Sequence, residues 1–92
     1  MKIWVKQFFE STKNETELNV ESLDSLKSCL DGEGWIHKDV FWSPDLQVDL
    51  LEKDNDSLYI IQETYFNVQL SAQPSVVEAL LCKLEEYDIK PI

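Results

Sequence analysis

Apolar and polar residues alternate along much of this chain, which is the pattern of half-buried β-strands. Residues 46–51 show it most clearly, because leucine or valine occupies every second position. The predicted strands lie at residues 2–9, 17–20, 35–42, 46–51 and 58–70. The last is longer than an ordinary strand, so it is either one bent strand or two strands joined by a bulge near Gln62–Thr64.

Two other stretches repeat their apolar residues with the period of an α-helix. The first covers residues 22–31, where Ser22 is a suitable N-cap and one of two glycines, Gly32 or Gly34, ends the helix in the left-handed conformation. The second begins at Pro74, a residue suited to a first helical turn. Cys82 faces away from the apolar stripe of this second helix. The two stripes consist of Leu23, Leu26 and Leu30, and of Val76, Val77, Leu80, Leu81 and Leu84.

Turns of hairpin length at residues 43–45 and 52–57 make the central strands antiparallel. The sequence therefore predicts an α+β fold, a two-layer sandwich of four to six mostly antiparallel strands with two amphipathic helices packed on one face. The order of the elements suggests a split β-α-β arrangement of the ferredoxin-like kind. The chain of 92 residues is predicted to form a single domain, 1–92.

The charge balance restricts the choice of partners. Eighteen acidic residues oppose eight basic ones, giving a net charge of −10, and every basic residue is lysine. Without arginine the chain lacks the bidentate fork that recognises phosphate and guanine, and its negative field repels nucleic acid and anionic membranes. We expect a basic protein partner, either a toxin or another nucleic-acid-processing protein, and no binding to nucleic acid or membrane.

Recognisable catalytic motifs are absent from the sequence, including those for phosphate, dinucleotide and zinc-protease chemistry. His37 and Asp39 lie two residues apart on a predicted strand, where they would share a face and the carboxylate would orient the imidazole. No nucleophile signature accompanies them, so a structural or surface histidine is the favoured interpretation. The sequence predicts that the protein is not an enzyme and uses no cofactor or metal.

Other candidate groups have ordinary explanations. Cys29 and Cys82 have no metal-ligand spacing and are predicted to be reduced thiols. Asp54 and Asp56 have the alternate spacing of a calcium loop but lack its central glycine, so a plain turn is favoured. The chain has no apolar run long enough to span a membrane and no secretory signal pattern at its N-terminus, which favours a cytoplasmic protein.

The central strands carry bulky residues on both alternating faces. One face is therefore predicted to mix aromatic residues with carboxylates, and a register slip of one residue would exchange the two sets. The residues expected to face the helices are Ile36, Val40, Val48, Leu50, Leu58 and Ile60. Those expected on the open face are Trp35, Phe41, Leu51, Tyr59, Ile61 and Tyr65, with Asp39, Asp49 and Glu63. Burial of these aromatic residues under loops or in a homodimer is an equal alternative to a binding surface.

An aromatic and acidic face suits a partner with a basic groove, because carboxylates steer the encounter and aromatic side chains act as anchors. The predicted partner-binding residues are Trp35, Asp39, Phe41, Asp45, Asp49, Asp54, Asp56, Tyr59 and Glu63. In size, charge and lack of catalytic residues, the chain is similar to immunity proteins that neutralise bacterial nuclease toxins and to phage-encoded anti-defence inhibitors that imitate the charge of DNA.

Of these two classes, we predict an immunity protein that neutralises a cognate toxin by stoichiometric occlusion. The competing predictions are the phage inhibitor and a structural or regulatory accessory module. The accessory module could be a homodimer whose acidity only aids solubility.

Overall fold

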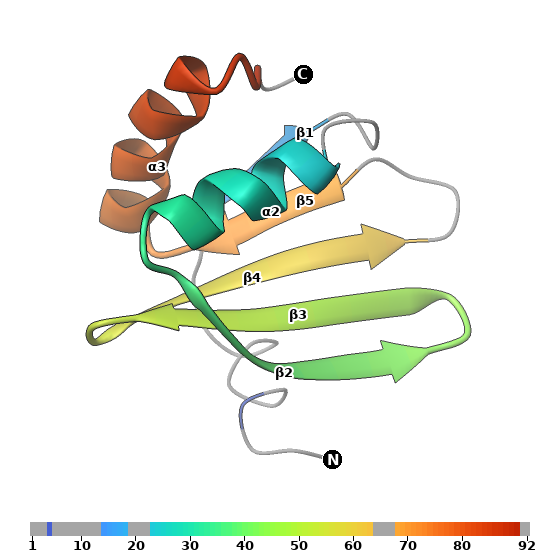
Figure 1. The fold of residues 1–92 in the computed structure, drawn as a ribbon. Coiled ribbons are helices and arrows are strands. Elements are labelled where there is room, and N and C mark those ends of the chain that lie inside the picture. Colours follow the sequence, from blue (N-terminus) through green and yellow to red (C-terminus); the bar gives the residue numbers. More distant parts are fainter. Residues whose placement is uncertain (1–3, 5–13, 19–22, 64–67, 91–92) are drawn as a thin grey trace.

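The computed structural model describes residues 4, 14–18, 23–63 and 68–90, which form five strands and two helices (Figure 1). In chain order the elements are β1 (Asn14–Leu18), α2 (Leu23–Gly32), β2 (Ile36–Ser43), β3 (Leu46–Lys53), β4 (Asp56–Glu63), β5 (Val68–Ala72) and α3 (Pro74–Glu86). The predicted α+β class is confirmed. The predicted strand at 2–9 lies outside the described residues except for Trp4, whose backbone is helical.

The five strands form one antiparallel sheet in the order β1-β5-β4-β3-β2. Strands β2, β3 and β4 each pair with the next strand along the chain, and β1 pairs with the other side of β5. The expected split β-α-β arrangement is wrong, because the two strands that α2 joins, β1 and β2, lie at opposite edges of the sheet (Figure 1).

The predicted long strand at 58–70 is in fact two strands that pair with each other. β4 and β5 run antiparallel, with Leu58 opposite Ala72, so the chain reverses direction between them and does not continue through a bulge. The hairpin between β3 and β4 is also tighter than the predicted loop 52–57, since only two residues separate the strands.

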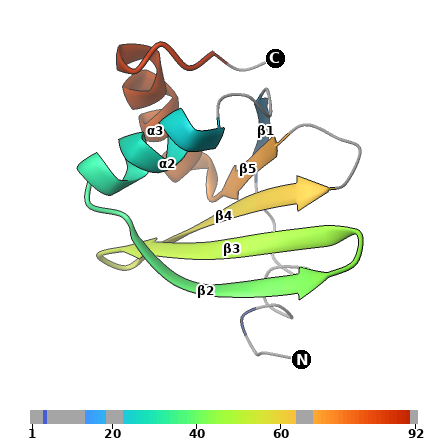
Figure 2. The same ribbon diagram turned by 45° about the vertical axis from the view of Figure 1, so that its right-hand side comes forward.

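Both helices lie on one face of the sheet, near β1 and β5 and away from β2 (Figures 1 and 2). The main core lies between the helices and this part of the sheet. It comprises Leu18, Leu26, Cys29, Leu30, Trp35, Leu51, Leu58, Ile60, Val68, Leu70, Ala72, Val76, Val77, Leu80, Leu84 and Ile89. The predicted stripes of both helices are confirmed, although Leu23 and Leu81 are only partly buried. Cys82 is exposed, as its position off the stripe predicted.

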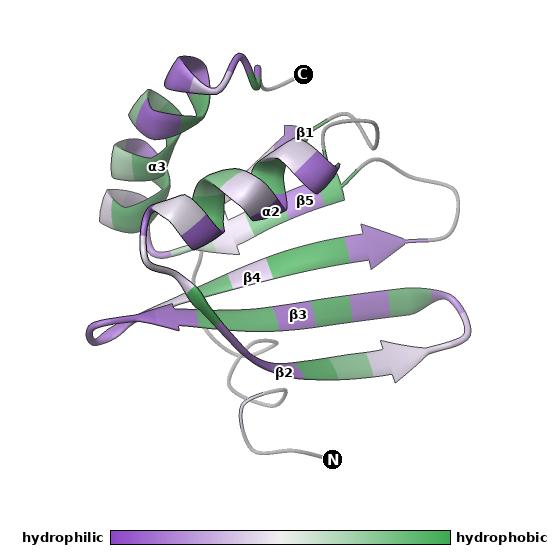
Figure 3. Cartoon of the chain, in the orientation of Figure 1, coloured by the Kyte–Doolittle hydropathy of each residue, from purple (hydrophilic) through white to green (hydrophobic). Residues whose placement is uncertain are grey.

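β3 turns its two sets of residues to the faces opposite to those predicted (Figure 3 shows its alternation). Leu51 packs in the main core beneath the helices. Val48 lies on the other face, in a second small cluster with Ile61. The expectation that Val48 and Leu50 face the helices is therefore wrong. Alternation identifies which residues share a face, but when both sets contain apolar residues it does not identify which face the helices cover.

The end of α2 explains the position of Trp35. Gly34 has φ 91°, a left-handed conformation that favours glycine. The Trp35 backbone N–H donates to the Leu30 carbonyl (2.9 Å), and the Gly34 N–H donates to the Asp31 carbonyl (3.1 Å). These two bonds define a Schellman motif, which is usually accompanied by an apolar contact between the two residues that its longer bond joins. Trp35 and Leu30 both lie in the main core, so the motif draws the indole inward.

The end of α3 repeats this geometry with different residues. Asp88 takes the left-handed conformation with φ 61°. The Ile89 N–H donates to the Leu84 carbonyl (3.0 Å), and the Asp88 N–H donates to the Glu85 carbonyl (3.1 Å). Ile89 and Leu84 are both buried. Each helix is thus followed by an apolar residue that closes one end of the core.

Candidate functional site

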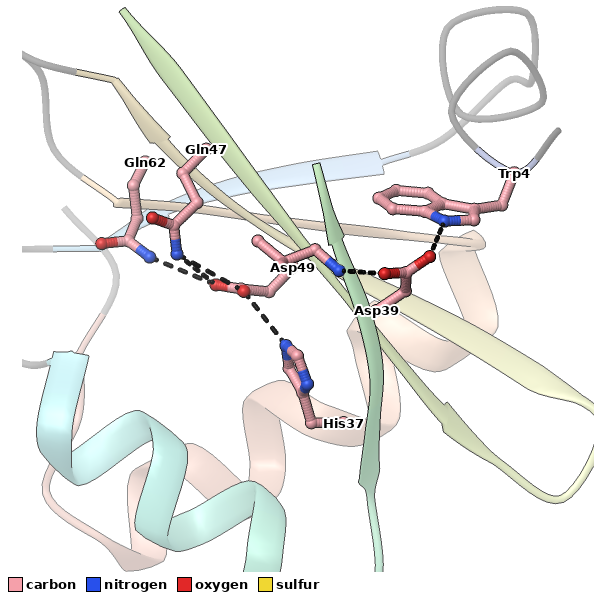
Figure 4. Close-up of polar contacts among 7 residues, drawn as sticks. Trp4, His37, Asp39, Gln47, Asp49 and Gln62 are labelled. Atoms are coloured by element: carbon pink, nitrogen blue, oxygen red, sulfur yellow. Dashed lines mark hydrogen bonds and ion pairs between the residues drawn. The ribbon is translucent and has the colours of Figure 1, made fainter. Parts of the chain in front are cut away.

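A bulge in β2 separates the two groups that the sequence placed together. Pairing with β3 shifts by one residue between His37, opposite Leu51, and Asp39, opposite Leu50. The extra residue, Lys38, turns the two side chains to opposite faces of the sheet. The expected His37–Asp39 pair is therefore wrong, and each residue has a different partner (Figure 4).

His37 meets Asp49 on the helix side of the sheet. Its Nε2 lies 3.1 Å from Asp49 Oδ1. An ionised carboxylate has no proton to donate, so Nε2 carries the hydrogen of this bond. The imidazole side chain is 53% exposed, whereas the Asp49 side chain is only 7% exposed. The buried carboxylate thus holds a ring that projects into solvent.

Two glutamines complete the surroundings of the Asp49 carboxylate. Gln47 Nε2 lies 3.2 Å from Oδ2 and 3.4 Å from Oδ1, and Gln62 Nε2 donates to Oδ2 at 3.2 Å. Gln47, Asp49 and Gln62 lie on the same face of the sheet, because Gln47 pairs directly with Gln62 and Asp49 follows Gln47 by two residues on β3. Burying a carboxylate is costly unless hydrogen bonds replace its water, and the side chains of His37, Gln47 and Gln62 supply these bonds (Figure 4).

A cavity of about 300 Å³ lies beside this cluster, between α2 and the middle of the sheet. It is lined by Lys27, Asp31, Trp35, His37, Asp49, Leu51 and Ile60. The lining has no serine, threonine or cysteine that His37 could activate as a nucleophile. The lining thus combines two carboxylates, one lysine, one imidazole and three apolar side chains.

On the opposite face, Asp39 belongs to an aromatic cluster. Trp4 Nε1 donates to Asp39 Oδ2 at 2.8 Å, and the Trp4 ring stacks on Tyr59 with centroids 6.2 Å apart and planes inclined by 21°. Phe41 and Leu46 pack against the same small core. Burial raises the pKa of the Tyr59 hydroxyl, and the nearby Glu52 carboxylate raises it further. The predicted mixture of aromatic rings and acid exists here, but Trp4 packs on it.

The structure does not bring the nine predicted partner-binding residues onto one surface. Trp35 and Asp49 are buried on the helix side, so the expectation that they share a face with Phe41 and Tyr59 is wrong. The register of β3 accounts for Asp49, and the Schellman motif accounts for Trp35. The half-buried residues of the far face are Asp39, Phe41, Tyr59 and Glu63. The remaining acids are exposed in the hairpin turns or beside them, namely Asp45, Asp54 and Asp56.

Three large apolar residues lie exposed on β2, and the sequence assigned two of them, Ile36 and Val40, to the core. Trp42 is 71% exposed, Ile36 58% and Val40 37%. Val40 and Trp42 are on the helix side, opposite Asp49 and Gln47. They stay exposed because β2 is the edge strand of the described sheet, beyond the reach of the helices (Figure 2). Alternation in the sequence shows which apolar residues share a face, but it does not show whether their strand lies at the edge or in the middle of the sheet.

The described residues contain no group of three or more His, Cys, Asp or Glu side chains placed to hold a metal ion. None of the described helices is long and apolar enough to cross a membrane. A second cavity, of about 450 Å³, lies between α3 and the β3–β4 hairpin, with Lys53 and Lys83 mixed among acids at its rim. No family model, curated protein or solved structure matches this chain.

Proposed function

We propose that this protein is a cytoplasmic inhibitor of the immunity type, which binds a basic, nuclease-type toxin and blocks it by occupying its surface in a fixed ratio. The observation that supports this most directly is the exposed Trp42. A tryptophan with 71% of its surface in water is unusual in a protein that acts alone, and tryptophan is among the residues that most often dominate a protein interface.

The residues around Trp42 indicate the charge of the partner that this surface would bind. We define the β2 surface as Val40 and Trp42 on the helix side of the edge strand, with the polar residues Gln47, Asp49 and Gln62 beside them. Asp45 follows in the turn after β2 and is exposed. An anchor next to carboxylates, in a chain of net charge −10, supports a partner of opposite charge.

A second function is favoured by the edge position of the same strand. Exposed apolar residues on an edge strand also suit pairing with a second copy of the chain. Sedimentation at several protein concentrations separates the two. A stable dimer that the Trp42→Ala change dissociates supports self-association. A monomer at all concentrations supports binding of a different protein at this surface.

The decisive experiment for inhibition uses a basic nuclease-type protein encoded beside this chain. Its activity is titrated with the purified protein, and a sharp endpoint at a fixed molar ratio is expected. Full inactivation by a small sub-stoichiometric amount would contradict occlusion and would indicate catalysis.

Matched aromatic variants then test the location of the contact. Trp42→Ala should weaken binding by 2 kcal/mol or more, roughly thirtyfold, because anchors dominate interface energy. Tyr87→Ala removes another exposed aromatic ring, 44% exposed at the end of α3, and should leave affinity almost unchanged. Equal losses of affinity in both variants would show that the contact does not lie on the β2 surface.

A further inference from the structure

We infer that the cavity beside His37 and Asp49 is a receptor for a guanidinium group, that of an arginine side chain supplied by the basic partner. This inference rests on the proposed function and names the chemistry by which that partner is recognised. The cavity lies on the same face as Val40 and Trp42, since Val40 pairs directly with Asp49. A partner anchored on Trp42 therefore has a charged pocket within reach.

The lining matches the two parts of an arginine side chain. Its apolar walls are Trp35, Leu51 and Ile60, which suit the three methylene groups and, in the case of the indole, the flat face of a guanidinium. Its carboxylates are Asp49 on the sheet and Asp31 on α2. Two carboxylates from different elements suit a planar fork with five donors better than they suit a compact ammonium.

Asp49 differs from an ordinary surface acid because it is held in place before any ligand arrives. Only 5% of the residue is exposed, and Gln47 and Gln62 fix the carboxylate from the side of the sheet. The third donor, His37, is the one with an exposed ring. An entering guanidinium can take the place of the half-exposed imidazole on Oδ1, because its planar fork of donors forms charge-assisted and bidentate hydrogen bonds with a carboxylate.

Lys27 opposes this ligand and provides a control. It lies one turn before Asp31 on α2, lines the same cavity, and is exposed. Among the residues that the structure describes, Lys27 and Asp31 do not form an ion pair with each other. Because their charges are opposite, the two side chains should change the affinity for a cation in opposite directions.

The experiment measures binding of small probes to the whole protein by NMR. The probes are N-acetylarginine methylamide, the lysine equivalent and the uncharged citrulline equivalent. The arginine probe should move the Trp35 indole and His37 signals saturably, with a Kd on the order of millimolar, as expected for one side chain. The lysine probe should bind more weakly and the citrulline probe should not saturate. The Trp4 indole, on the opposite face, should not move.

Exposed variants test the charge without risk to the fold. Asp31→Asn should weaken the arginine probe about two- to fivefold, and Lys27→Gln should strengthen it by a similar factor. Glu78→Gln, at an exposed position on α3 outside the cavity lining, should have no effect. The buried Asp49→Asn change should abolish saturable binding, and its folded state is checked from the chemical shifts of β1 and α3, which contribute no residue to the cavity lining.

Each contrary result overturns the assignment. Equal binding of the arginine and citrulline probes would show that the pocket recognises only the apolar part of the side chain. Stronger binding of the lysine probe would contradict a preference for guanidinium. Shifts of all three tryptophans, or no response to Asp31→Asn and Lys27→Gln, would show that the charge effect is not local. These outcomes are independent of the titration above, since the probes need no partner. Probe binding without an inhibited toxin would reject the proposed function alone.

Discussion

The regions of the sheet around β5 and around β2 differ in how far they bury similar apolar residues. Around β5, apolar side chains lie beneath α2 and α3, and Val68, Leu70 and Ala72 are at most 1% exposed. On β2, Val40 and Trp42 point to the same side of the sheet but lie in solvent. The difference comes from the placement of the helices and not from the strands themselves. Stability should therefore reside at the β5 end and recognition at the β2 end.

Truncation of one large residue at each end should give the widest contrast. Leu84→Ala removes a fully buried side chain that contacts the core from α3, so the free energy of unfolding should fall by about 2–5 kcal/mol. Trp42→Ala should change it by less than about 0.5 kcal/mol, since the ring is mostly exposed. Denaturant melts measure both. A large loss of stability in Trp42→Ala would mean that β2 belongs to the cooperative core.

Asp49 lies at the border between the two ends, and its replacement tests whether the polar cluster is structural. Asp49→Ala leaves the amides of Gln47 and Gln62 without their acceptor, so stability should fall by about 1–3 kcal/mol. Thermal unfolding monitored by circular dichroism would measure this. His37→Ala is the matched control and should cost little, because its half-exposed ring returns to water. Equal costs for the two variants would contradict the view that the glutamines hold the carboxylate.

The two helix ends allow a smaller and more specific comparison. Gly34→Ala places a Cβ where the nearest other atom, Lys53 Cε, is 3.7 Å away, so the cost is conformational and should be about 1 kcal/mol. Asp88→Gly should stabilise by a few tenths of a kcal/mol to about 1 kcal/mol, because glycine adopts the left-handed conformation more easily. Chemical denaturation gives both values. The same sign for both changes would show that backbone conformation does not decide them.

The smallest expected effect concerns the two thiols, because labelling of the exposed Cys82 should leave the free energy of unfolding unaltered. Burial raises the pKa of the Cys29 thiol, and the carboxylates of Glu33 and Glu86 raise it further. Cys29 should therefore stay protonated and unreactive in the folded protein, while the exposed Cys82 is labelled by a maleimide. Mass spectrometry after short labelling should find one adduct, at Cys82. Rapid labelling of both thiols would mean that the helix-covered end opens readily.

The raised pKa of Cys29 also sets the sign of its contribution at high pH. The folded state binds this proton more tightly than the unfolded chain does. The stabilisation is complete below the unfolded pKa, near 9, and is lost as the pH rises through the higher folded value.

Much of the fold followed from periodicity, because long amphipathic patterns depend on local sequence. Both helix stripes and the antiparallel hairpins were predicted correctly. The reversal between β4 and β5 was missed, since the run 58–70 contains no glycine or proline to mark a turn. The position of Trp35 could have been anticipated from Gly34, because a Schellman motif places an apolar residue directly after its glycine.

The candidate site was harder to predict for a different reason. The contacts of Asp49 with Gln62, and of Asp39 with Trp4, join residues far apart in the sequence. They depend on the register of β3 and on strand order, which alternation does not encode. Charge, by contrast, is additive along the chain, so the expectation of a basic partner needed no structure and stays a prediction.

The bulge in β2 has a consequence for how chains of this kind can vary in length. Lys38 is the residue that pairing with β3 does not need. A deletion of Lys38 should therefore leave His37 opposite Leu51 and Asp39 opposite Leu50, with both side chains still on their present faces. A deletion of Trp42, closer to the hairpin, would instead exchange the faces of every residue between it and the bulge. Lys38 is thus a position where the gain or loss of one codon is compatible with the β2 surface.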